Sequence, residues 1–222
     1  MQLTREPLLT ALCALLRRTY ALSAPMLPID RYVIGDAGLR ALYPNGERCA
    51  RSEAGDGAKL LVRETGAGVR ACIYYPDAMI RRLEDKPPQH GLNDDNVQPF
   101  AVFVEELDHL LVAAERAHAG RGVSLLEMEI QANVSKDLVL SRFLTRRGRR
   151  LDPGRRAWLR HHLFHGRTFN DADPGVRSRY DEASGLALRF LRTLEASPAV
   201  DRLEKLRRFH RAPLAVKLAL SR

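Results

Sequence analysis

The sequence predicts an α+β protein with a small antiparallel sheet around a β-hairpin at about residues 59–75, followed by a mostly helical C-terminal part. Two apolar runs of strand length flank a glycine-containing turn, as a hairpin requires. From about Pro99 onward, the apolar residues recur with the 3.6-residue period of helices. The chain has 222 residues, of which 45% are hydrophobic. This is enough for a packed core and excludes collagen-like, low-complexity and wholly disordered proteins.

The first half of the chain contains one clear helix and the hairpin. Helical periodicity begins near residue 5 and is broken by Pro25 and Pro28. The elements that we expect here are a helix at 5–20, short elements over 30–57, strands at 59–64 and 69–75, a short helix from Pro76 to about Leu83, and a polar loop at 85–96.

The second half is helical almost throughout. Gly120 and Gly122 end a first helix, and Ser124 is placed to cap the next one. We expect about six helices in the protein, most of them after residue 98. Those of this half are predicted at 99–119, from Ser124 to about 147, and at 153–165, 176–196, 199–210 and 213–221. The chain is expected to be a single domain over 1–222, with an α/β-containing part at about 1–98 and a helical part at about 99–222.

Charge is unevenly distributed along the chain. The net charge is +9, and residues 141–222 hold 20 Lys and Arg against 8 Asp and Glu. A basic surface of this kind can bind nucleic acid, anionic lipid or an acidic protein. The three widely spaced cysteines contain no CxxC pair, which indicates reduced thiols and a cytoplasmic protein. No run of 18 uncharged apolar residues occurs, so we expect no membrane span.

The segment Glu105-Glu106-Leu107-Asp108-His109 is the most informative one for chemistry. Glu105 and His109 are four residues apart, so on a helix they project from one face, as two ligands of one metal ion would. Glu106 is placed to act as a general base toward a metal-bound water. The alternative is that Glu105 and Asp108 lie on a solvated helix face with His109 at its edge.

This segment resembles the HExxH signature of zincin metallopeptidases, with Glu105 in place of the first histidine. In the gluzincin branch, the third ligand is a glutamate on a downstream helix. The resemblance therefore implies that Glu127 or Glu129, both in the next predicted helix, completes the site. Because residues two apart on a helix point in different directions, at most one of these two can do so. The ligand set implied is compatible with zinc, manganese or iron.

Two further clusters are candidate sites. His161 and His165 are again four residues apart and are candidate additional ligands, unless their helix is simply basic and partly exposed. Arg146, Arg147, Arg149 and Arg150 could contact phosphates, unless they form a solvated turn between helices.

These observations support two expectations about function and an intermediate one. The first is a metal-dependent, zincin-like hydrolase with one divalent ion, most readily zinc. The second is a non-enzymatic cytoplasmic protein whose basic helical surface binds nucleic acid or an acidic partner. The intermediate reading is an inactive zincin-like scaffold. The chain lacks a P-loop and a dinucleotide-binding fingerprint, so no nucleotide cofactor is indicated.

Overall fold

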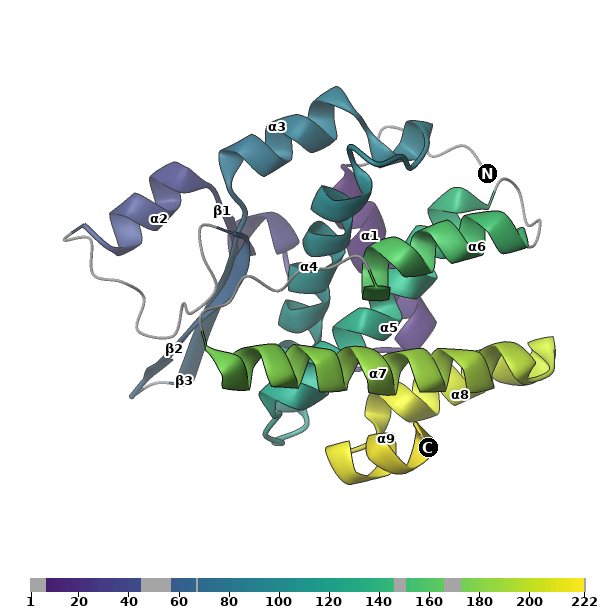
Figure 1. Ribbon diagram of the computed structural model, residues 1–222. Coiled ribbons are helices and arrows are strands. Elements are labelled where there is room, and N and C mark those ends of the chain that lie inside the picture. Colours follow the sequence, from purple (N-terminus) through teal and green to yellow (C-terminus); the bar gives the residue numbers. More distant parts are fainter. Residues whose placement is uncertain (1–6, 45–56, 67, 146–150, 166–172, 222) are drawn as a thin grey trace.

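The computed structural model describes residues 7–44, 57–66, 68–145, 151–165 and 173–221. Within these ranges the chain forms nine α-helices, three short helical turns and a three-stranded sheet (Figure 1). The α-helices are α1 (Leu8–Tyr20), α2 (Asp36–Leu42), α3 (Asp77–Asp85), α4 (Val97–His118), α5 (Leu125–Leu144), α6 (Pro153–Arg160), α7 (Pro174–Ala196), α8 (Ala199–Arg211) and α9 (Leu214–Leu220). The turns are η1 (Ile29–Tyr32), η2 (Pro88–His90) and η3 (His161–His165).

The sheet contains the predicted hairpin and one additional strand. Strands β2 (Lys59–Thr65) and β3 (Gly68–Tyr74) pair antiparallel, with Leu61 opposite Cys72. Strand β1 (Val33–Ile34) pairs parallel to β3, so the strand order is β1-β3-β2. The sheet is therefore mixed: the predicted antiparallel hairpin is present, and the parallel pairing of β1 departs from the expected antiparallel sheet. Strand β1 has only two residues, which is too short to produce a period-2 pattern.

The helix count also differs from the expected number of about six. Six of the nine described α-helices begin at or after Val97, and the other three are α1, α2 and α3. Helix α2 has seven residues and no buried side chain, so it lacks the apolar stripe by which helices are recognised. The helix predicted at 153–165 is α6 followed by the π-helical turn η3. The broad α+β prediction holds.

Helix α4 lies at the centre of the fold. It packs against α5, α1 and α3 and against strands β2 and β3, and α5 in turn packs against α7 (Figure 1). Helix α5 begins where the Ser124 hydroxyl accepts a hydrogen bond from the Glu127 backbone N–H at 3.1 Å. Because α4 is covered on several sides, even its polar residues are buried, and Glu105, Glu106, Asp108 and His109 are all among them.

No helix in the described part of the chain is both long enough and apolar enough to cross a lipid bilayer.

Candidate metal centre

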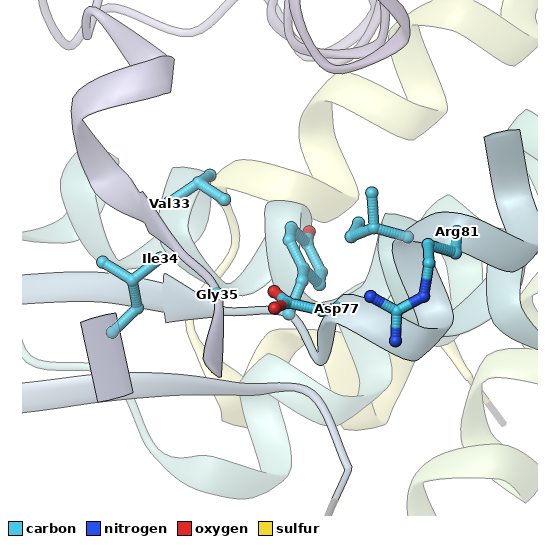
Figure 2. Close-up of a pocket in the computed structure, with 7 residues that line it drawn as sticks. Val33, Ile34, Gly35, Asp77 and Arg81 are labelled. Atoms are coloured by element: carbon cyan, nitrogen blue, oxygen red, sulfur yellow. The ribbon is translucent and has the colours of Figure 1, made fainter. Parts of the chain in front are cut away.

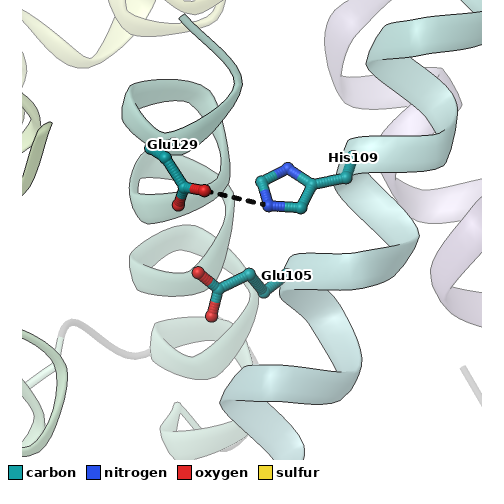
Figure 3. Close-up of side chains that lie close together, drawn as sticks. All are labelled: Glu105, His109 and Glu129. Atoms are coloured by element: carbon teal, nitrogen blue, oxygen red, sulfur yellow. Dashed lines mark ion pairs between the residues drawn. The ribbon is translucent and has the colours of Figure 1, made fainter. Parts of the chain in front are cut away.

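Helices α4 and α5 bring together in the interior three side chains of types that can bind a metal ion. Glu105 and His109 project from adjacent turns of α4, and Glu129 points toward them from α5 (Figure 3). One potential ligand atom from each residue lies within 4.8 Å of the other two. Each of the three residues is only 7% exposed. The i,i+4 spacing explains why the two α4 residues share a face, and the packing of α4 on α5 supplies the third ligand.

Among the described residues, the imidazole of His109 makes no hydrogen bond that would prevent it from binding a metal ion. Its Nε2 lies 3.7 Å from Glu129 Oε1, which is beyond hydrogen-bond distance. Its Nδ1 is buried and has no hydrogen-bond partner among the described residues. Burial lowers the pKa of His109, and this effect outweighs the opposing influence of the Glu105 and Asp108 carboxylates. The imidazole is therefore held in the neutral form, which is the form that binds metals.

Lys136 is a member of this cluster that sequence reasoning did not identify. Its Nζ lies 3.0 Å from Glu105 Oε2, and the side chain is completely buried. Lys136 follows Glu129 by seven residues on α5, which places both on the same face of the helix. In sequence, the only available indication was that a lysine interrupts the apolar series of a predicted core helix.

Asn133 lies on this face of α5 as well, one turn after Glu129. It is 2% exposed, and its Oδ1 has no hydrogen-bond partner within the described ranges. The oxygen and nitrogen of an amide can be exchanged by rotation of the side chain, so either atom can occupy this position.

Glu106, the expected general base, connects the cluster to the sheet. Its carboxylate accepts a hydrogen bond from the backbone N–H of Leu60 on β2, an edge strand of the described sheet. The pKa of Glu106 is raised well above its usual range, chiefly by burial and then by the neighbouring Glu105 and Glu129 carboxylates. A carboxyl group with a raised pKa binds a proton more tightly than an exposed glutamate does.

Two tyrosines border the carboxylates. Burial and the negative charges of Glu129, Glu105 and Glu106 raise the pKa of Tyr180, on α7. The hydroxyl of Tyr75 donates a hydrogen bond to the Phe103 carbonyl oxygen at 2.7 Å, and burial together with Glu106 raises its pKa. Both phenols stay protonated and can act only as hydrogen-bond donors or acceptors.

Other residues considered as ligands lie elsewhere. Glu127 points away from the group and pairs with Arg116, whose Nη2 lies 2.6 Å from Glu127 Oε1. His161 and His165 are exposed in η3 and do not belong to the Glu105–His109–Glu129 group. The phosphate-binding candidates Arg146, Arg147, Arg149 and Arg150 lie outside the described residues.

A surface depression of about 310 Å³ lies apart from this centre, between β1, the end of β3 and α3 (Figure 2). Its lining includes Gly35, Asp77 and Arg81. A Cβ atom at Gly35 would lie 2.2 Å from Asp77 Oδ1, so a larger residue here would displace the Asp77 carboxylate. In the structure this carboxylate accepts a hydrogen bond from the Asp36 N–H at 3.2 Å. Glu105, His109 and Glu129 do not line this depression.

No protein-family model matches this chain, and no curated protein or solved structure is significantly similar to it.

Proposed function

We propose that this protein binds one divalent metal ion through Glu105, His109 and Glu129, and that it is a metal-dependent hydrolase or an inactive relative of one. The observation that carries the proposal is the convergence of three buried ligand atoms from two helices within 4.8 Å of one another. Buried carboxylates are costly unless a cation or a hydrogen bond compensates them. His109 is neutral, and its Nδ1 makes no hydrogen bond within the described residues. A cluster that served only to pair charges would not need such a side chain, whereas a metal site would use it as a ligand.

The donor atoms limit the identity of the ion. Two carboxylates and one imidazole suit zinc, manganese and iron, whereas calcium and magnesium prefer oxygen ligands throughout. Three protein ligands are also typical of catalytic rather than structural zinc sites, because one coordination position remains open for water or substrate.

The residue that favours hydrolysis is Glu106. A metal ion in this group would lower the pKa of a coordinated water and polarise a substrate carbonyl. Glu106 lies next to Glu105 and interacts electrostatically with both ligand carboxylates. It can therefore accept the proton that such a water releases, while the hydrogen bond from Leu60 holds its carboxylate in place.

Metal analysis by inductively coupled plasma mass spectrometry tests the binding proposal. Protein purified without chelator and without a tag should contain close to one zinc, manganese or iron ion per chain. A Glu105→Ala/His109→Ala double variant should contain almost none. His161→Ala/His165→Ala is the matched control, because these histidines have the same spacing but are exposed. Wild-type protein without metal, or a double variant that retains it, would contradict the proposal.

A screen with peptide and ester substrates tests the hydrolase proposal. Activity should require the metal and should disappear in Glu106→Gln. A metal-loaded wild-type protein without activity on either class would instead favour the inactive relative.

A further inference from the structure

The face of α5 that contributes Glu129 continues with Asn133 and then Lys136, at intervals of four and three residues. At one end of this face, Glu129 Oε1 lies 3.7 Å from His109 Nε2. At the other end, Lys136 Nζ lies 3.0 Å from Glu105 Oε2. The later residue of α5 meets the earlier residue of α4, so the two helices run antiparallel here. Asn133 therefore lies between these two contacts, on the side of α5 toward which Glu105 and His109 point (Figure 3).

The amide oxygen of Asn133 is buried without a compensating interaction in the described part of the chain. The residue is 2% exposed, and no described donor forms a hydrogen bond to its Oδ1. Burying an acceptor in this way costs free energy unless another group compensates it. A metal ion is such a group, because amide oxygens are among the ligands that hard divalent cations bind.

We propose that the amide oxygen of Asn133 is a fourth ligand of the ion bound by the metal group, which consists of Glu105, His109 and Glu129. This inference rests on the proposed metal binding and specifies it further. Each helix would then contribute two ligands that are four residues apart, Glu105 and His109 from α4, and Glu129 and Asn133 from α5.

A fourth protein ligand narrows the choice of ion. A four-coordinate zinc ion would have no position left for water or substrate. Manganese and ferrous iron accept six ligands, so two positions would remain open. A set of three oxygens and one nitrogen also suits manganese better than zinc, which favours nitrogen and sulfur ligands. The site would therefore be a manganese or ferrous iron site.

Gln131 provides a matched control because it is a second buried amide on α5. It is 0% exposed, and its Oε1 accepts a hydrogen bond from Lys217 Nζ at 3.0 Å. Because Gln131 is two residues from both Glu129 and Asn133, its side chain points in a different direction. Gln131→Leu therefore removes a buried amide from the same helix without changing the metal group.

The experiment compares the affinities for Mn²⁺ and Zn²⁺ at one pH. Chelator-treated wild type, Asn133→Leu, Asn133→Ala and Gln131→Leu are freed of chelator and titrated calorimetrically, and circular dichroism melting checks that each is folded. Leucine has nearly the shape of asparagine but no ligand atom. Alanine is smaller than asparagine and cannot clash, so Asn133→Ala is expected to fold even if Asn133→Leu does not.

Wild type and Gln131→Leu should share one Mn²⁺-to-Zn²⁺ affinity ratio. In the Asn133 variants, the affinity for Mn²⁺ should fall by about tenfold or more. The affinity for Zn²⁺ should fall less, because three protein ligands and a water complete its coordination, so the ratio should fall as well. Metal binding with an unchanged ratio in the Asn133 variants that fold would overturn the role of Asn133 but leave the metal site intact. If wild type binds neither ion, the proposed function fails, and this inference fails with it.

Discussion

Arg116 and Glu127 form a buried ion pair in which guanidinium Nε and Nη2 lie 3.0 and 2.6 Å from the same carboxylate oxygen. Nη2 also donates a hydrogen bond to the His210 carbonyl oxygen at 2.7 Å. The pair therefore joins α4 and α5 to the end of α8. Glu127 and Glu129 are two residues apart on the same helix, yet one belongs to this structural network and the other to the metal group.

Glu127→Gln and Glu129→Gln should therefore have different effects. Glu127→Gln should lower the free energy of unfolding by about 3 kcal/mol, because it removes the charge partner of a buried arginine, but the metal content should be unchanged. Glu129→Gln should lower the metal content at least severalfold, with a smaller effect on the stability of the metal-free protein. Urea unfolding in the presence of chelator and elemental analysis measure the two effects. Equal metal loss in both variants would mean that the separation of roles is wrong.

Glu106→Gln should separate activity from folding. The variant keeps the metal ligands, so it should retain the metal and lose hydrolytic activity. The pKa of Glu106 is raised in the folded protein, so the stabilisation from its bound proton is present at low pH and is lost as the pH rises through that pKa. A glutamine cannot lose this proton. In chelator, the variant should therefore gain stability relative to wild type as the pH rises from 5 to 8. A constant stability difference across this range would indicate that Glu106 is not buried as described.

Asp108→Asn tests a chain of buried hydrogen bonds that ends at Asp108, the residue next to His109. Tyr20 donates to the Ser135 hydroxyl at 2.7 Å, and Ser135 donates to Asp108 Oδ1 at 2.6 Å. Burial raises the pKa of Asp108 to about 6, so its contribution to stability is present below pH 4 and is lost as the pH rises through 6. Asparagine keeps the acceptor for Ser135 but does not titrate.

The stability of Asp108→Asn relative to metal-free wild type should therefore increase by about 2 kcal/mol between pH 4 and pH 7. Urea unfolding at several pH values in this range provides the measurement. Ser135→Ala is the companion variant, because it removes the hydrogen bond but keeps the carboxyl group. Parallel pH profiles for wild type and Asp108→Asn would contradict the assignment.

The long elements of this fold could be predicted because their apolar periods are strong. The β2–β3 hairpin and helices α4, α5 and α7 lie within a few residues of their expected bounds. Strand β1 and helix α2 could not be predicted individually. Strand β1 has only two residues, and helix α2 has seven residues and no buried side chain, so neither shows a detectable hydrophobic period.

Only the part of the candidate centre that lies on one helix, Glu105 and His109 on α4, could be predicted from the sequence. The spacing of Glu105 and His109 is a local property, and their common face follows from it. Whether Glu127 or Glu129 joins them depends on how α5 is rotated about its axis relative to α4, which is a tertiary property. Lys136 was missed for the same reason, since its contact with Glu105 spans 31 positions of the sequence.

His210 contributes an acid-sensitive element to the core. Its ring stacks on Tyr20 with a centroid distance of 4.5 Å, and the residue is 1% exposed. Neither ring nitrogen has a hydrogen-bond partner in the described part of the chain. Burial, followed by the positive charges of Lys217 and Arg116, lowers the pKa of His210 to about 3. The folded protein therefore keeps this imidazole neutral at pH values at which the unfolded chain protonates it.

His210→Phe should consequently stabilise the protein. Phenylalanine preserves the stacking on Tyr20 and removes two buried polar atoms, which should raise the free energy of unfolding by about 1 kcal/mol at pH 7. As the pH falls through 6.5, the unfolded wild-type chain binds a proton that the folded one does not, so wild type loses stability. The advantage of the variant should therefore grow by about 2 kcal/mol between pH 7 and pH 5. His118→Phe, at an exposed position on α4, should leave the pH dependence close to that of wild type. If His210→Phe were less stable than wild type at both pH values, the His210 ring nitrogens would have to make a hydrogen bond that the described structure does not contain.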